Sequence, residues 1–121
     1  MANFSSNPTH SPDFDIEYYT ENATLSNREK SLIEHRMNKL TKGHRDISGA
    51  SVAVECISGD NKRAEYKARI VVYCKPANIV GSSTHQSIYS AVTDALEAIE
   101  RQVRDQRERM RDRHRTARQA Q

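Results

Sequence analysis

The chain has 121 residues, of which 36% are hydrophobic and none is Trp, so we expect one domain with a modest core. No run of about 18 apolar residues is present, and the N-terminus lacks the basic and apolar regions of a signal peptide, which predicts a cytoplasmic protein without a membrane span. The net charge is only +3, but eight of the 19 basic residues are Arg residues between Arg101 and Arg118, so positive charge is concentrated at one end.

The N-terminal part of the chain predicts a leader, a strand and a helix. Residues 1–12 are polar and contain two Pro residues, so we expect a disordered leader. Residues 14–19 alternate apolar and acidic side chains, as a strand does. Ser26 and Glu29 have the spacing of a capping box, and the apolar residues that follow recur at helical spacing. The pattern predicts a first helix over residues 27–42.

The remainder predicts three strands and a long helix. Residues 50–57 and 64–75 alternate on either side of a polar turn cluster, which is typical of a hairpin, and a short strand is expected at residues 79–83. An amphipathic helix then begins near Ile88; its apolar face fades after Val103, while Arg residues continue.

This β-α-β-β-β-α order predicts an α+β fold. We expect a two-layer sandwich in which two helices lie on one face of a four-stranded sheet, with the first two strands parallel and the later ones antiparallel. Without its first strand, the order is that of double-stranded-RNA-binding domains. We expect the folded domain to span residues 13–106 and an Arg-rich helix extension or tail to span residues 107–121.

No residue pattern typical of catalysis, of a metal site or of a cofactor site is present. The sequence contains no P-loop, dinucleotide motif or nucleophile elbow, and its five His residues are scattered. In a simple hairpin register Cys56 would lie opposite a residue near Tyr66 rather than Cys74, so we expect two reduced, buried thiols and no disulfide. We therefore expect neither an enzyme nor a small-molecule substrate.

Basic side chains border the apolar stripes of both predicted helices. If the helices pack side by side, these two flanks would border one groove that binds phosphates. The flanking residues are Arg36, Lys39 and Lys42 on the first helix and Arg101 and Arg104 on the last. The outer face of the sheet could extend this surface through Lys67, Arg69 and Lys75.

The alternative is a solvated helix surface with ordinary ion pairs between residues four apart. Glu97 with Arg101 and Glu100 with Arg104 have this spacing. The charge pattern alone favours nucleic-acid binding. It is also consistent with a protein partner, or with basic residues that serve only solubility.

Two segments resemble the ribosome hibernation-promoting factor and ribosome-associated translation inhibitor family. The stretch from Ile88 to Val103 is similar to the family's last-helix signature, with matching residues at Tyr89, Ala91, Arg101 and Gln102. The run Arg36-Met-Asn-Lys39-Leu40-Thr-Lys42 resembles the basic run of the family's first helix. The resemblance covers about residues 14–111.

The resemblance implies a ribosome-binding translation inhibitor that acts by occlusion. It would occupy the decoding channel of the small ribosomal subunit and block mRNA and tRNA binding during stress or stationary phase, with rRNA and neighbouring ribosomal proteins as partners. The rRNA contacts would come from Arg36, Lys39, Lys42, Arg101 and Arg104, and the late residues Arg107, Arg109 and Arg111 would add affinity.

The end of the chain at Gln121 resembles the short family type, for which we expect a monomer away from the ribosome. Two other hypotheses remain open at this point. One is a general dsRNA-binding or RNA-chaperone module, and the other is a transcription-associated regulator bound to protein through the Arg-rich helix.

Overall fold

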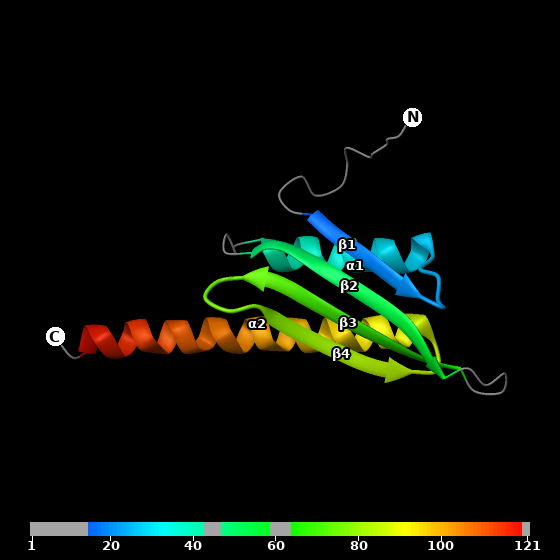
Figure 1. The fold of residues 1–121 in the computed structure, drawn as a ribbon. Helices are drawn as coiled ribbons and strands as arrows, with labels where there is room; N and C mark the ends of the chain where they lie inside the picture. The colour runs from blue at the N-terminus through cyan, green and yellow to red at the C-terminus, as the bar shows by residue number, and fades with distance from the viewer. Residues whose placement is uncertain (1–14, 43–46, 59–63, 120–121) are drawn as a thin grey trace, which may run out of the picture.

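The computed structural model describes residues 15–42, 47–58 and 64–119, and it confirms the expected order of elements. The fold is α+β, with a four-stranded mixed sheet and two helices (Figure 1). The elements in chain order are β1 (Asp15–Glu21), α1 (Asn27–Thr41), β2 (Ile47–Ser58), β3 (Glu65–Cys74), β4 (Ile79–His85) and α2 (Ile88–Gln119).

Element boundaries differ modestly from the sequence prediction. Strand β2 begins three residues earlier than expected, because a register irregularity between Ile47 and Gly49 lets its pairing with β3 continue. Strand β4 continues to His85, and α1 ends at Thr41 with Lys42 in an extended conformation as its C-cap. The predicted leader, residues 1–12, lies outside the described residues.

The sheet has the order β1-β2-β3-β4. Strands β1 and β2 are parallel, and the two later pairs are antiparallel, as expected. Cys56 lies opposite Tyr66, which confirms the predicted hairpin register, and Cys56 and Cys74 are not bonded to each other. The prediction that both thiols are buried was wrong, because each is only partly buried. Cys74 lies at the strand end, where its Sγ lies 3.2 Å from the Ala77 carbonyl oxygen.

Both helices cover the same face of the sheet and run in the same direction (Figure 1). Alternation along β3 places Ala68, Ile70 and Val72 in the core, and α2 covers them with six buried side chains. These are Ala91, Val92, Ala95, Leu96, Ile99 and Val103. Helix α1 contributes Ile33 and Met37, both essentially inaccessible to solvent. The core therefore lies between the sheet and the two helices.

Glycine at position 81 lets α2 approach β4 closely. A Cβ atom at Gly81 would lie 2.5 Å from the backbone oxygen of Ala95 and 3.1 Å from the Ile99 side chain. The same contact region is joined by a hydrogen bond in which Gln102 Nε2 donates to the Val80 carbonyl oxygen at 2.7 Å. Backbone contact and side-chain hydrogen bonding thus fix α2 on the edge strand.

Both helix starts are capped. The Ser26 Oγ accepts the Glu29 amide at 3.4 Å and Glu29 accepts the Ser26 amide at 2.8 Å, which confirms the capping box. At the start of α2 the Ser87 hydroxyl accepts the amide of Ser90 at 3.1 Å. These caps set the position of each first turn and hence of the side chains between the helices.

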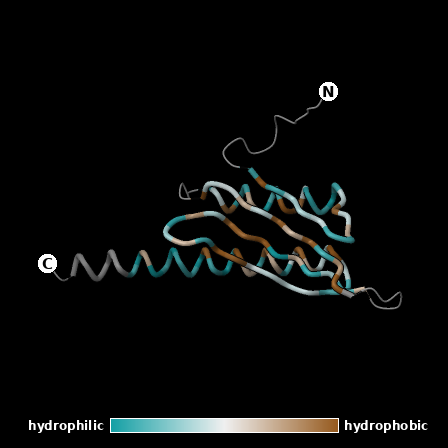
Figure 2. Tube along the Cα trace, in the orientation of Figure 1, coloured by the Kyte–Doolittle hydropathy of each residue, from teal (hydrophilic) through white to brown (hydrophobic). Residues whose placement is uncertain are grey.

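Helix α2 extends well past the sheet (Figure 1). Val103 is its last buried residue in the described part, and the helix continues as a hydrophilic rod (Figure 2). Its 32 residues correspond to a length of about 48 Å. Within the described residues, no helix has the length and apolar character needed to cross a membrane.

A candidate nucleic-acid interface

A bidentate ion pair joins the two helices. Arg36 of α1 donates from Nε and Nη2 to the two carboxylate oxygens of Glu100 of α2, each at 2.7 Å. The side chains are 24% and 33% exposed, so the pair is only partly shielded from solvent. The hydrogen bond to Glu100 is the largest influence on Arg36 and raises its pKa, although partial burial opposes this. The geometry fixes the spacing of the helices at this point.

Beyond this pair the helices enclose an open groove, which we call the α1–α2 groove. It has a volume of about 390 Å³. The apolar side chains of Leu40 and Val103 form part of its wall. The charged residues that line it are Arg36, Lys39, Glu100, Arg104 and Arg107. Four cations and one carboxylate line the groove, so its formal net charge is positive.

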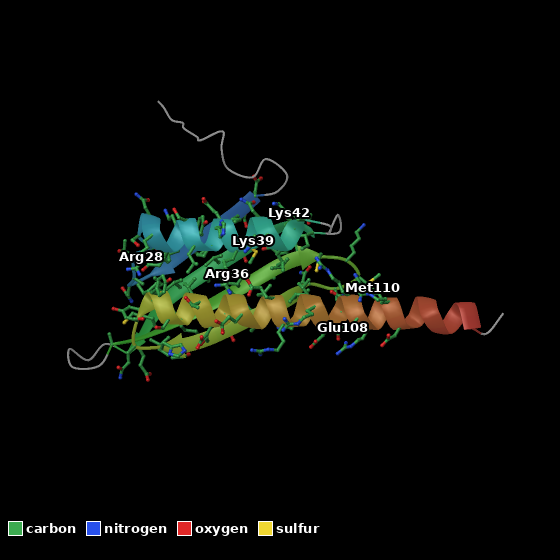
Figure 3. The ribbon with its side chains drawn as sticks, turned by 180° about the vertical axis from the view of Figure 1, so that it is seen from behind. Arg28, Arg36, Lys39, Lys42, Glu108 and Met110 are labelled. Carbon is green, nitrogen blue, oxygen red and sulfur yellow. The ribbon has the colours of Figure 1, made fainter. Side chains whose placement is uncertain are left out.

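The α1–α2 groove brings together only part of the predicted site. It combines Arg36 and Lys39 from α1 with Arg104 from α2, which confirms that basic residues of both helices border one groove. Lys42 and Arg101 are exposed but do not line it. Figure 3 shows Arg36, Lys39 and Lys42 in order along α1, toward the end where α2 projects.

Three predicted residues on the projecting helix have different orientations. Arg107 lines the groove, although the sequence suggested only a role in the extension. At about 100° per residue, Arg111 lies on the same side of α2 as Arg107, whereas Arg109 lies on nearly the opposite side. Arg109 and Arg111 are both exposed.

The predicted basic residues of the sheet lie away from the α1–α2 groove. Lys67 and Arg69 alternate with the buried Ala68 and Ile70, so they are exposed on the outer face, opposite the helices. Lys75 is exposed directly after β3. These residues cannot contact a ligand in the groove and could bind only to another surface of a partner.

Sequence reasoning missed two contacts between the helices. The spacing of four residues predicted that Glu100 pairs with Arg104, but in the structure Glu100 pairs with Arg36. Sequence reasoning also overlooked Arg28, whose guanidinium carbon lies over the Tyr89 ring at 4.6 Å from the ring centre. No spacing rule along one helix could have revealed either contact, because each joins residues more than sixty positions apart.

Two further polar contacts join the helices to the sheet. The Tyr18 hydroxyl of β1 donates to Glu34 of α1 at 3.3 Å, and Lys30 lies over the same ring at 5.4 Å. Burial and the Glu34 carboxylate raise the pKa of Tyr18, so the phenol stays protonated. His85 and Asp94 form a further pair between β4 and α2. Among residues with described side chains, no group of three metal-ligating residues is found.

A family model described as Sigma 54 modulation protein / S30EA ribosomal protein matches residues 16–111. The chain belongs to this family of ribosome-associated proteins. The match spans β1 from its second residue, the other three strands, α1 and most of α2, including every residue that lines the α1–α2 groove. It confirms the resemblance to hibernation-promoting factors found in the sequence.

Solved structures show the same fold. A ribosomal subunit interface protein from Coxiella burnetii superposes with a TM-score of 0.64 at 15% identity, covering 78% of this chain and 99% of that one. The N-terminal domain of Protein Y from Thermus thermophilus gives a TM-score of 0.59 at 18% identity, covering 74% of this chain and 96% of that one. No curated protein sequence matches the chain significantly.

Proposed function

We propose that this family member binds the small ribosomal subunit and occupies its decoding channel, where it blocks mRNA and tRNA during stress or stationary phase. The observation that carries the proposal is the α1–α2 groove, which combines cations from two helices in a chain of a ribosome-associated family. The inhibition is steric, and no catalytic step is required. A ribosome-bound factor of this kind would act in the cytoplasm.

The chemistry of the groove suits an RNA backbone. Arg104 and Arg107 can donate paired hydrogen bonds to phosphate oxygens, while Lys39 supplies a flexible point charge. Such contacts depend on the shape and backbone of RNA more than on its sequence. The release of counterions from the phosphates would provide much of the affinity and make it dependent on salt.

The remaining basic residues would contact other parts of the channel. Lys42 and Arg101 are exposed on α1 and α2 outside the groove. Because a channel surrounds its occupant, Lys67, Arg69 and Lys75 on the far side would approach a different wall. We propose residues 13–106 as the ribosome-binding domain and residues 107–121 as an extension that adds affinity. Helix α2 runs without interruption across that boundary.

Co-sedimentation with separated ribosomal subunits tests this function. The protein should migrate with the small subunit in a sucrose gradient at moderate salt, and a bound mRNA should reduce its recovery there. Absence from the small-subunit fraction would contradict the proposal. A general dsRNA-binding module would instead bind free duplex RNA with comparable affinity, and a regulator bound to protein would bind neither.

A further inference from the structure

An exposed cation–π pair lies at the opposite end of the interhelical seam from the α1–α2 groove. Arg28 is in the first turn of α1 and Tyr89 is in the first turn of α2, and the guanidinium lies over the ring. The two first turns are adjacent because the helices run in the same direction (Figure 1). Figure 3 shows Arg28 at the far end of α1 from Lys42.

This pair is accessible and is not needed to fill the core. Tyr89 is 37% exposed, and Arg28 is also exposed. A cation in the first turn of a helix is disfavoured by the helix dipole, so helix stability does not explain the choice of Arg at position 28. The pair joins the same two helices, α1 and α2, as the Arg36–Glu100 ion pair that borders the groove.

We propose that Arg28 and Tyr89 form a stacking site for an unpaired nucleobase of RNA. Proteins stack splayed bases on aromatic rings and on the planes of Arg guanidinium groups, and this pair offers both. A phosphate alone would use the edge of the guanidinium and would gain nothing from the Tyr ring. The inference rests on the proposed function, because it assigns a second contact to the same RNA partner.

The distance from the stacking pair to the groove can be spanned by one continuous segment of single-stranded RNA. Tyr89 and Arg104 are fifteen residues apart on α2, which corresponds to a rise of about 22 Å. At about 3.4 Å per nucleotide, the axial spacing of one strand in a stacked duplex, this distance corresponds to about seven nucleotides. One single-stranded segment along the seam would therefore place a base on the pair and phosphates in the groove. Arg36 and Glu100 lie between the two contacts.

Substitutions of Arg28 and Tyr89 distinguish a loss of base stacking, which lowers the affinity alone, from a loss of charge, which also changes the salt dependence of the affinity. Tyr89→Leu removes the ring and should weaken binding to the small subunit about 5- to 100-fold, with an unchanged slope of affinity against salt, because no phosphate contact is lost. Tyr89→Phe keeps the ring and should bind as the wild type does. Arg28→Lys keeps the charge but not the planar group, so it should weaken binding without altering the slope. Lys39→Gln, the matched control, should lower the slope by about one.

Cross-linking provides a readout that a purely structural role would not produce. Ultraviolet irradiation of the wild-type complex with small subunits should link Tyr89 to an rRNA base, detected by mass spectrometry of the digested complex. Thermal unfolding of each variant shows whether the fold is retained. If Tyr89→Leu unfolds, Tyr89→Phe, Arg28→Lys and the cross-link still decide the question.

The two proposals fail in different ways. If the wild type binds the small subunit but Tyr89→Leu binds equally well, or no cross-link forms at Tyr89, the stacking site is wrong and the proposed function stands. If the pair only clamps the helices together, Tyr89→Leu should lower the melting temperature without a loss of affinity in the folded protein. If the wild type does not bind the small subunit, both proposals fall.

Discussion

At the residue scale, the Arg36–Glu100 ion pair controls the charge of the α1–α2 groove. The sequence presents Arg36 as a free cation on a basic flank, but the structure neutralises it with a carboxylate from the other helix. The groove thus depends on Lys39, Arg104 and Arg107 for its net charge. A phosphate entering the groove would compete with Glu100 for the guanidinium.

Replacement of the carboxylate tests this role. Glu100→Gln frees Arg36, so the affinity for small subunits should rise at low salt and the salt slope should increase by about one. The loss of a partly exposed ion pair should reduce the free energy of unfolding by only about 1 kcal/mol or less. Filter binding across a salt series and denaturant unfolding measure the two effects.

Arg36→Gln is the reciprocal control. It leaves Glu100 unpaired in the groove, so the affinity should fall by more than the removal of one isolated cation would cause. An unchanged affinity in either variant would contradict the pairing as the cause.

At the element scale, α2 serves first as a core helix and then as a projecting basic rod. Its buried apolar face ends at Val103, and helix geometry aligns the groove residues Arg104 and Arg107 with Arg111 farther along. The sequence predicted the buried face and the change at Val103, because side-chain periodicity reports burial directly. It could not predict which cations would face α1, since this depends on how the two helices are rotated on the sheet.

The rod itself can be tested by comparing two Arg residues on different sides. Arg111→Gln should lower the salt slope of small-subunit binding by about one, because Arg111 continues the stripe that lines the groove. Arg109→Gln should have a smaller effect, because Arg109 points away from that stripe. Both positions are exposed, so neither change should alter stability by more than about 0.5 kcal/mol. Equal effects on binding would show that the rod has no preferred side.

The packing of α2 against β4 depends on Gly81. Gly81→Ala places a methyl group 2.5 Å from the backbone oxygen of Ala95, so either the helix or the strand must shift. We expect a loss of about 1–3 kcal/mol in the free energy of unfolding, measured by urea denaturation. Ser82→Ala, at the next and exposed position of β4, should change it by less than about 0.5 kcal/mol. A neutral Gly81→Ala would mean that α2 packs less closely than described.

At the scale of the whole molecule, the layer of helices carries most of the proposed RNA contacts, and the sheet holds the helices in position and presents further basic residues on its outer face. The strand directions and the shared helix layer followed from the order of the elements, and the hairpin register followed from alternation, as Cys56 opposite Tyr66 illustrates. The two interhelical contacts, Arg36 with Glu100 and Arg28 with Tyr89, did not. They arise from the packing of distant segments, about which local periodicity carries no information.

The most direct test of the account is displacement of a labelled mRNA from small ribosomal subunits. The wild-type protein should release the mRNA in a concentration-dependent and salt-sensitive manner, because both compete for one channel. The double variant Lys39→Glu/Arg104→Glu, which reverses two charges of the α1–α2 groove, should require at least about tenfold more protein, given a loss of more than about 1.4 kcal/mol in binding. Retention of the mRNA while the wild-type protein is bound, or equal displacement by the double variant, would contradict the account.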